Sequence, residues 1–324
     1  VVSFSTTKGV VATAVHMALE RAGLAPDAPV AAVWPEFKAA GKAEVTIRQL
    51  LCHEAGVPQI RDQVEDVWAM ADWPAMVAMV AGLSPLWPPG TANGYHAINW
   101  GWLAGELLAR VDGRALARFL AEEVSGPLGL DGCFVGVPPE EEHRLAPVAL
   151  DAAYRDMPPL ENLLPADSIT LQALSPKGDV VEFVNSEVGR RACVPAITGA
   201  FTARSLATVY AALERGGALD GVRLLEPGTL EAAVAVQNTR PDLVLFVPVG
   251  WRLGYMSMGN PGGLSVGGTA GAYGHAGLGG SLALADPRTG LAVAVTLDRL
   301  QLNLLNDARA SGLVTAAAAS VLDG

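Results

Sequence analysis

Ser5-Thr6-Thr7-Lys8-Gly9-Val10-Val11 is the stretch of this 324-residue chain that says most about its architecture. It places a hydroxyl and an amine three residues apart, and residues at that spacing share one helix face. A serine is a weak nucleophile until a base takes its proton, and a lysine can be that base when burial or a cationic neighbour lowers its pKa. The spacing therefore indicates acyl transfer. The same residues also fit a helix N-cap followed by a solvated lysine, so other motifs must decide.

The residues that follow predict a mainly helical region. The run from Gly9 to Ala22 is nearly apolar on every side and stops at Gly23, which is typical of a buried helix. Further helices are expected at Thr46 to Leu51, Asp72 to Gly82, His96 to Val111, Arg114 to Glu123, Ala203 to Arg215 and Glu226 to Val236. Residues 131–200 have no sustained period, and short strands are expected there at Cys133 to Val137 and His143 to Leu150.

The C-terminal third changes to a strand pattern. Strands are expected at Leu243 to Val249, Gly250 to Ser257, Leu278 to Asp286 and Leu291 to Leu297, and a final helix at Leu302 to Leu322. The turn residues from Asp286 to Gly290 predict a hairpin between the last two strands. We therefore expect an α+β fold, with a mostly helical domain at residues 1–236 packed against an antiparallel sheet domain at residues 237–324.

Composition limits the function classes. With 51% hydrophobic residues, 17% charged residues and a net charge of −11, the chain resembles a globular enzyme and would repel nucleic acid and anionic lipid. No uninterrupted stretch of about 18 apolar residues predicts a membrane span. The three cysteines, Cys52, Cys133 and Cys193, are widely spaced, which predicts buried thiols rather than disulfides or a metal site and favours the cytoplasm.

Two more segments complete a pattern with Ser5-Thr6-Thr7-Lys8. They are Pro89-Gly90-Thr91 with Tyr95-His96-Ala97, and His275-Ala276-Gly277. In this order, the three motifs resemble those of the serine β-lactamase and penicillin-binding protein superfamily. Within it, the chain is most similar to the class C-like esterases, the family VIII carboxylesterases, from Val1 to Leu322. The resemblance implies a β-lactamase-like fold, and because two strands should precede Ser5, we expect upstream sequence to be missing.

The resemblance also implies roles for individual residues. Ser5 is expected to be the acylated nucleophile and Lys8 the group that accepts its proton. Tyr95 is expected to act as partner base and then as proton donor to the leaving group. The oxyanion is expected between the backbone N–H groups of Ser5 and Leu278, on the strand of the third motif. No metal or cofactor is required.

Two departures from the family pattern point to neutral esters. Ala97 stands where β-lactamases have an asparagine that holds the substrate amide, and His275 stands where they have a lysine that attracts the substrate carboxylate. Both losses disfavour β-lactams and favour small neutral esters. Three aromatic residues near the third motif are expected to line a substrate pocket: Trp251, Tyr255 and Tyr273.

Several alternatives stay open at this stage. Gly263-Leu264-Ser265-Val266-Gly267 matches the nucleophile elbow of α/β-hydrolases, although it lies between loop residues and no acid separates Ser265 from His275. Within the resembling fold, a β-lactamase, a D-aminopeptidase or an acyltransferase are alternatives. A non-catalytic binding protein is an alternative of another class. His16 is expected in the core, and His53 with Glu54 lacks a third metal ligand. The oligomeric state is left open.

Overall fold

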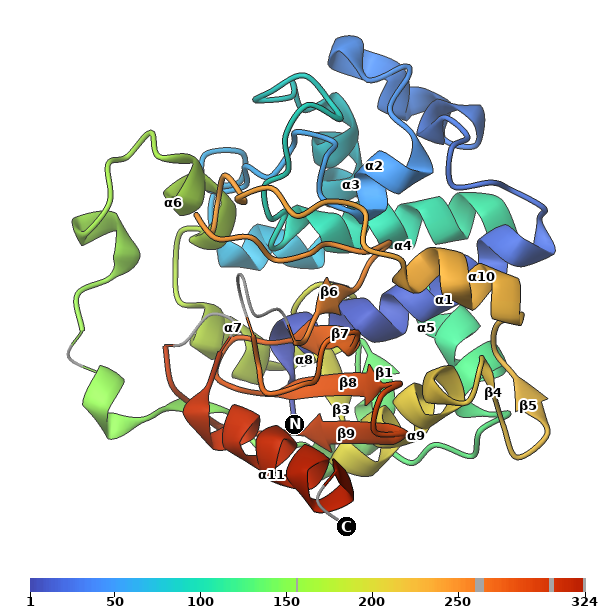
Figure 1. The fold of residues 1–324 in the computed structure, drawn as a ribbon. Coiled ribbons are helices and arrows are strands. Elements are labelled where there is room, and N and C mark those ends of the chain that lie inside the picture. The colour runs from blue at the N-terminus through green and yellow to red at the C-terminus, as the bar shows by residue number, and fades with distance from the viewer. Residues whose placement is uncertain (156, 260–264, 303–305, 323–324) are drawn as a thin grey trace.

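The computed structural model describes residues 1–155, 157–259, 265–302 and 306–322. Its α-helices are α1 (Thr7–Arg21), α2 (Ile47–Leu51), α3 (Trp73–Gly82), α4 (Asn99–Asp112), α5 (Leu116–Leu120), α6 (Ile169–Leu174), α7 (Val180–Asn185), α8 (Glu187–Arg191), α9 (Ala203–Glu214), α10 (Pro227–Val234) and α11 (Ala308–Leu322). Helices α2, α3 and α4 gather on one side of the molecule, and the sheet, α11 and both termini lie on the other (Figure 1).

The strands are short. They are β1 (Cys133–Val135), β2 (Ala149–Leu150), β3 (Gly199–Phe201), β4 (Ala218–Leu219), β5 (Val222–Arg223), β6 (Met256–Ser257), β7 (Tyr273–Ala276), β8 (Leu282–Asp286), β9 (Leu291–Val295) and β10 (Arg299–Leu300). The largest sheet of the described residues has four antiparallel strands in the order β6-β7-β8-β9, which confirms the predicted α+β class. Helix α9 packs against β8 and β9.

Helix α1 confirms the prediction of a buried N-terminal helix. Every residue from Thr7 to Leu19 is buried, and the helix packs mainly against α4 while also touching β7. A side chain at Gly9 would overlap the hydroxyl of Tyr210, so only glycine lets this part of α1 come so close to its neighbour. Burial on every face follows from a sequence that is apolar on every face. The helix therefore holds its first turn at the centre of the molecule.

The predicted helix caps are present where their residue types place them. The Thr46 hydroxyl accepts a hydrogen bond from the Gln49 N–H, and the Gln49 side chain accepts one from the Thr46 N–H, which together form a capping box. The Asp72 carboxylate accepts from the Ala75 N–H at 3.1 Å. The Thr202 hydroxyl accepts from Ser205 N–H at 3.1 Å. Local side-chain chemistry thus set the start of α2, α3 and α9.

Three strand predictions need correction. Residues 243–249 form no strand, because the Asp242 carboxylate turns the chain by accepting from the N–H groups of Val244 and Leu245. The expected strand Gly250 to Ser257 shrinks to β6, since Gly254 has a φ of +86° that breaks an extended backbone. Of the expected strand His143 to Leu150, only β2 forms, and residues 139–144 are a 3₁₀-helix instead.

The boundaries of several other elements also differ from those predicted. The expected strand Leu278 to Asp286 begins at Leu282, because Gly279 and Gly280 have φ values of +84° and +106° and form a turn. His275 and Ala276 of the third motif lie on a separate strand, β7, which ends before Gly277 and is not among the strands expected from the sequence pattern. Helix α4 begins at Asn99 rather than His96, and α11 begins at Ala308, with residues 303–305 outside the described residues. The hairpin at Asp286 to Gly290 is confirmed by its register. The domain boundary at residue 236 stays a prediction.

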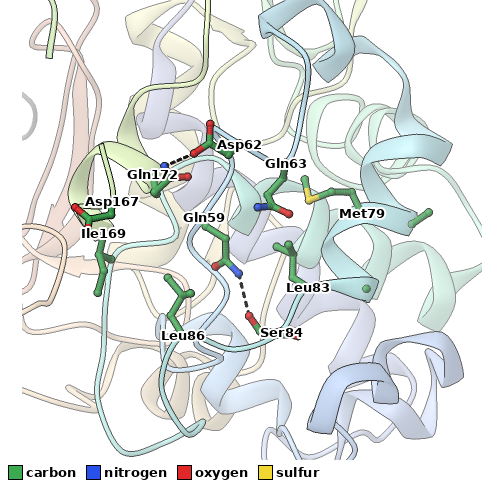
Figure 2. A pocket seen from close by; sticks show the side chains of 12 residues that line it. Gln59, Asp62, Gln63, Met79, Leu83, Ser84, Leu86, Asp167, Ile169 and Gln172 are labelled. Atoms are coloured by element: carbon green, nitrogen blue, oxygen red, sulfur yellow. Dashed lines mark hydrogen bonds between the residues drawn. The ribbon is translucent and has the colours of Figure 1, made fainter. Parts of the chain in front are cut away.

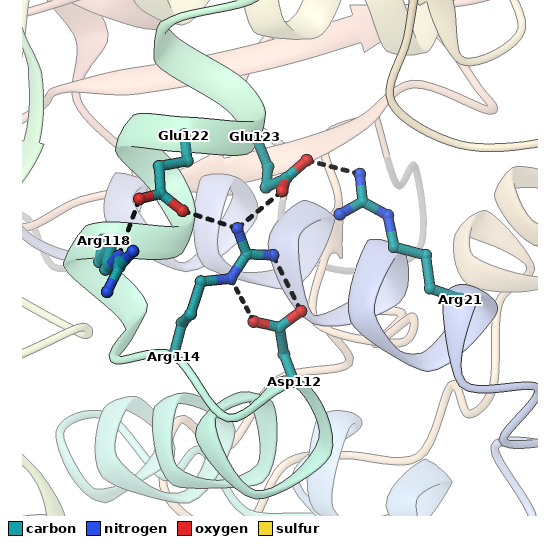
Figure 3. Close-up of polar contacts among 6 residues, drawn as sticks. All are labelled: Arg21, Asp112, Arg114, Arg118, Glu122 and Glu123. Atoms are coloured by element: carbon teal, nitrogen blue, oxygen red, sulfur yellow. Dashed lines mark hydrogen bonds and ion pairs between the residues drawn. The ribbon is translucent and has the colours of Figure 1, made fainter.

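An ion-pair network joins the far end of α1 to the helices beside it. The Arg114 guanidinium donates to both carboxylate oxygens of Asp112, at 2.6 and 2.9 Å, and to Glu122 and Glu123 at 2.8 and 2.7 Å. Glu123 also accepts from Arg21, the last residue of α1, at 2.8 Å (Figure 3). Exposed pairs contribute little one by one, but a bidentate arginine at the centre of a network is stronger. The network attaches the C-terminal end of α1, opposite Ser5.

Candidate active site

Ser5 lies in a tight turn that leads directly into α1. The turn is the 3₁₀-helix η1 (Phe4–Thr6), and Phe4 has a φ of +46°, a left-handed conformation that costs a non-glycine residue free energy. The Thr6 hydroxyl donates to the Ser281 carbonyl at 2.9 Å, and a side chain at Gly277 would overlap the Ser3 carbonyl. The first and third motifs are therefore in direct contact.

The Lys8 amine points at the Ser5 hydroxyl. Its Nζ lies 3.0 Å from Ser5 Oγ, 2.6 Å from the Ala97 carbonyl oxygen and 3.4 Å from the Ala196 carbonyl oxygen. The side chain is fully buried, and this burial lowers the pKa of Lys8 well below its ordinary value. As placed, Nζ donates to all three oxygens; after losing one proton, the amine can keep its two N–H bonds to the carbonyls and turn its lone pair to the serine O–H. The contact and the lowered pKa both favour the expected role of Lys8 as a base, which stays a prediction.

Tyr95 stands over the same amine. The Lys8 Nζ lies 5.0 Å from the centre of the Tyr95 ring, and the ring stacks on Trp251 with centroids 5.2 Å apart. Burial raises the pKa of Tyr95 above its ordinary value, an effect that the neighbouring Ser5 hydroxyl partly offsets. Within the described residues, the phenolic oxygen has no hydrogen-bond partner of good geometry. A buried, unsatisfied hydroxyl facing the nucleophile is available to a reacting group.

The expected oxyanion donors lie on two neighbouring turns. Leu278 is in the turn between β7 and β8 rather than on a strand, because the chain bends back so that the Gly277 N–H donates to the Ser281 carbonyl at 2.7 Å. The Leu278 N–H donates to no described residue. The Ser5 N–H belongs to the first turn of a helix, where N–H groups lack an acceptor within the helix. Oxyanion binding by these two groups stays a prediction.

Buried neutral histidines surround the tyrosine. The His275 ring stacks on Tyr95 at 6.2 Å and donates from Nδ1 to the Ala276 carbonyl at 2.7 Å, while its buried Nε2 has no partner among the described residues. His96 Nε2 accepts from the Val57 N–H at 2.9 Å. Burial lowers the pKa of both rings to about 3, and the nearby Lys8 amine adds to the effect at His275. The third motif therefore presents no positive charge.

We expect acid to destabilise the protein through these rings. In the unfolded chain both histidines return to a pKa near 6.5, so the unfolded state binds more protons than the folded state between pH 6.5 and about 3. The contribution of the two neutral rings to the free energy of unfolding is therefore fully present above pH 6.5. As the pH drops through this window, the free energy of unfolding falls by about 1.4 kcal/mol per pH unit for each histidine. Urea unfolding at pH 7, 6, 5 and 4 measures the slope.

A comparison of variants separates the histidines from other titrating groups. His275→Asn should reduce the slope of the free energy of unfolding by about 1.4 kcal/mol per pH unit. His143→Asn, at an exposed ring, is the matched control and should keep the wild-type slope. A slope that is unaltered in His275→Asn would contradict the prediction.

The predicted aromatic residues occupy different places. Trp251 packs on Tyr95 and on His53, whose ring centroid is 4.2 Å away. Tyr255 packs beside the middle of α1, where its hydroxyl is 2.9 Å from the Thr13 hydroxyl. The Tyr273 ring packs edge-on against the Tyr255 ring. All three side chains are buried. Contact of Tyr255 and Tyr273 with substrate stays a prediction, and the contacts described give both a packing role.

Several residues that lie at the site were not singled out from the sequence, and another was interpreted as structural. The Ala196 carbonyl comes from the irregular region, which carries no motif. Asp242, whose carboxylate accepts from the Tyr95 N–H, comes directly before the expected strand Leu243 to Val249 and was not singled out. His53, interpreted as structural, packs edge-on against Tyr95 at 5.1 Å. His16 is in the core as expected, with Nε2 2.8 Å from the Leu253 carbonyl. No described group of three His, Cys, Asp or Glu side chains could hold a metal.

Two sequence alternatives can be placed. Ser265 is in a loop, as expected, and its neighbours Gly263 and Leu264 in the elbow pattern lie outside the described residues. Cys52 and Cys133 are buried free thiols, and Cys193 is a partly buried one. Among the described residues, none of the helices has the length and apolar character needed to cross a bilayer.

A cavity of about 800 Å³ lies apart from the contact between Ser5 and Lys8 (Figure 2). Its lining combines amide, carboxylate and apolar side chains, among them Gln59, Asp62, Met79, Asp167 and Gln172. Gln59 donates to the Ser84 carbonyl at 2.9 Å across it. Ser5, Lys8, Tyr95 and His275 do not line this cavity, so its size says nothing about the substrate.

Comparison with known proteins gives the family of the chain. The chain is 33% identical over 306 residues to the esterase/beta-lactamase LipL of Mycobacterium tuberculosis, covering 92% of this chain and 68% of LipL. It matches the crystal structure of a penicillin-binding protein homologue from Caulobacter crescentus with a TM-score of 0.85 and 38% identity, over 98% of this chain and 83% of that one. It matches a family VIII carboxylesterase structure with a TM-score of 0.87 and 32% identity, over 99% and 82% of the two chains. A beta-lactamase family model matches residues 2–316, and the chain therefore belongs to the beta-lactamase family.

Proposed function

We propose that this protein is a serine carboxylesterase that hydrolyses small neutral esters through an acyl-enzyme on Ser5. The observation that carries the proposal is the 3.0 Å contact between Lys8 Nζ and Ser5 Oγ, made by a buried lysine whose pKa is held well below its ordinary value. The names of two similar proteins, an esterase/beta-lactamase and a family VIII carboxylesterase, support the same chemistry.

In the acylation step, Ser5 Oγ attacks the ester carbonyl carbon as its proton passes to the neutral Lys8 amine. The carbonyl π electrons move onto oxygen, and the N–H groups of Ser5 and Leu278 hold the resulting oxyanion. When the tetrahedral adduct collapses, the C–O bond to the alcohol breaks. The alkoxide takes a proton from the Tyr95 phenol, which Lys8 then reprotonates, so that proton number is conserved.

In the deacylation step, water replaces the alcohol and the same groups act in reverse order. As the water oxygen attacks the acyl carbon, Tyr95 takes a proton from the water and passes its own phenolic proton to the neutral Lys8 amine, so that one proton is transferred in all. Collapse of the second adduct returns a proton to Ser5 Oγ and releases the carboxylic acid. The carbonyl groups of Ala97 and Ala196 hold the amine in place throughout, at 2.6 and 3.4 Å from Nζ.

The preference for neutral esters rests on the charge of the site. His275 is buried and its lowered pKa leaves the ring neutral at pH 7, so the third motif offers no cation to a substrate carboxylate. Ala97 contributes its carbonyl to Lys8 and has no side chain that could bind an amide. Both observations disfavour β-lactams and peptides. β-Lactam hydrolysis stays a second candidate because LipL, a relative, is named for both activities.

The remaining proposals concern the partner molecule, the cellular compartment and related reactions. A small-molecule ester is the proposed partner, without nucleic acid or membrane, on the net charge of −11. The unpaired thiols of Cys52, Cys133 and Cys193 support the cytoplasm as the compartment. D-aminopeptidase and acyltransferase activity belong to the same chemistry, with an amide in place of the ester or an alcohol in place of water.

A substrate panel tests the proposed specificity. We expect kcat/KM to be higher for p-nitrophenyl acetate and butyrate than for the octanoate. A chromogenic cephalosporin should react at least about 10- to 100-fold more slowly than the butyrate, because the site lacks the ionic hydrogen bond, worth about 1.5–3 kcal/mol, that would hold its carboxylate. A p-nitrophenyl ester with a terminal carboxylate is the matched control for charge, and should be a poorer substrate than its neutral analogue. Preference for the cephalosporin would make the protein a β-lactamase instead.

A further inference from the structure

Asp242 is a buried carboxylate next to the site, and its partners are all neutral donors. Its side chain is 1% exposed. One oxygen accepts from the backbone N–H groups of Tyr95, Val244 and Leu245 at 3.0, 2.9 and 3.1 Å. The other accepts from Asn93 Nδ2 at 3.1 Å and Trp251 Nε1 at 2.8 Å. No ion pair with Asp242 is found among the described residues.

Burying a carboxylate without a cationic partner costs free energy, so the place where the fold keeps one points to a role there. Removing a carboxylate from water costs several kcal/mol, and here neutral donors rather than a cation offset that cost. Those donors come from parts of the chain far apart in sequence: the second motif at Asn93 and Tyr95, and the segment at Trp251 before β6. The carboxylate thus joins the second motif to the sheet side of the site.

Asp242 is connected to Tyr95 in two ways, through the Tyr95 backbone and through the Trp251 ring. The carboxylate binds the Tyr95 backbone directly, and it binds the indole of Trp251, whose ring stacks on the Tyr95 ring at an interplanar angle of 18°. The Tyr95 hydroxyl has no hydrogen bond of good geometry to a described residue that could orient it. The position of the phenol therefore depends on its backbone anchor and on ring packing.

We propose that Asp242 is a positioning residue for the reaction, because its carboxylate fixes the backbone and the ring of Tyr95 so that the phenol faces Ser5 and Lys8. The proposal rests on the proposed function, in which Tyr95 transfers a proton. The negative charge also acts on the phenol itself, since after burial it is a further cause of the raised pKa of Tyr95.

A double-mutant cycle between Asp242 and Tyr95 tests the proposal. Asp242→Asn keeps one acceptor oxygen but places an NH₂ group against donors. We expect kcat for p-nitrophenyl butyrate to fall about 10- to 100-fold with little change in KM. In a Tyr95→Phe background the same substitution should cost less than about 3-fold, because there is no longer a phenol to position. If Asp242→Asn only disturbs the fold, it should lower kcat by the same factor in the wild-type and the Tyr95→Phe backgrounds. That outcome would overturn the proposal.

The chain offers a matched control in Asp286. Asp286 is 2% exposed, and its carboxylate accepts from the Thr269 N–H at 2.9 Å and the Arg288 N–H at 3.2 Å. Its side-chain hydrogen bonds to described residues include none to Ser5, Lys8 or Tyr95. Asp286→Asn should lower the melting temperature without lowering kcat of the folded enzyme in either background. A selective kcat loss in Asp286→Asn would show that any buried carboxylate has this effect, and would also overturn the proposal.

Two further measurements keep the test decisive. If Asp242→Asn does not fold, Asn93→Ala replaces it in the cycle, because it removes one donor to the carboxylate and leaves Tyr95 untouched. We expect a few-fold loss of kcat that disappears in the Tyr95→Phe background. Ser5→Ala distinguishes the two levels of failure. If Ser5→Ala stays active, the proposed function is wrong; if it is inactive while the cycle is additive, only the role of Asp242 is wrong.

Discussion

Ser5→Ala should lower kcat for p-nitrophenyl butyrate by about 10⁵-fold or more, because no other group can form the acyl-enzyme and the oxyanion donors alone retain little activity. The substitution removes one buried hydroxyl and leaves η1 and α1 intact, so the melting temperature should change little. Stopped assays with purified enzyme measure the loss, and circular dichroism measures the fold.

Ser265→Ala is the matched control for the nucleophile. Ser265 is partly buried in a loop and is the serine of the alternative elbow pattern. Its replacement should leave kcat unchanged. Intact-mass spectrometry after reaction with a fluorophosphonate should show one adduct in the wild type and in Ser265→Ala, and none in Ser5→Ala. Activity retained in Ser5→Ala and lost in Ser265→Ala would reverse the assignment.

Lys8→Met should lower kcat/KM by about 10²- to 10⁴-fold, the usual contribution of a positioned acid–base group. Methionine fills a similar volume and has no amine to desolvate, although it leaves the Ala97 and Ala196 carbonyls without their donor. We therefore expect a small change in melting temperature and a large change in rate. Lys8→Arg should not restore activity, because a guanidinium stays protonated and cannot accept the Ser5 proton.

Lys42 is the matched control for Lys8. It is also fully buried, and its amine donates to the Ala39 carbonyl at 2.8 Å and to the Leu83 carbonyl at the end of α3. Lys42→Met should lower the melting temperature, since a helix end loses its donor, while kcat of the folded enzyme stays the same. Equal rate losses in Lys8→Met and Lys42→Met would argue against a catalytic role for Lys8.

The pH dependence of the reaction offers a second readout for Lys8. Because burial lowers the pKa of Lys8 well below its ordinary value, the amine loses its proton at a lower pH than an exposed lysine does. Activity should fall as the pH drops through that lowered pKa, when the amine becomes an ammonium and can no longer take the Ser5 proton. An acidic limb of kcat/KM near the ordinary lysine pKa of 10.5 would contradict the burial argument.

The helices and caps of the first two thirds of the chain were predictable because their signals are local. Thr46, Asp72 and Thr202 cap helices through contacts only a few residues away, and the apolar run after Ser5 forms a buried helix whatever surrounds it. The strands near the third motif were harder. Left-handed residues such as Gly254 and Gly279, and the side chain of Asp242, interrupt an apolar pattern that is otherwise typical of strands.

The three motifs could be found in the sequence by their resemblance to the β-lactamase superfamily: a hydroxyl and an amine one turn apart, a tyrosine, and a glycine-flanked histidine in place of a cation. Their protonation states could not, because a pKa depends on burial by residues distant in the chain. The carbonyls of Ala97 and Ala196 hold the Lys8 amine, and Asp242 holds Tyr95, across separations of 89, 188 and 147 residues. Contacts over such separations leave no periodic trace in the sequence, since backbone groups and a single carboxylate provide them, and folding alone brings them together.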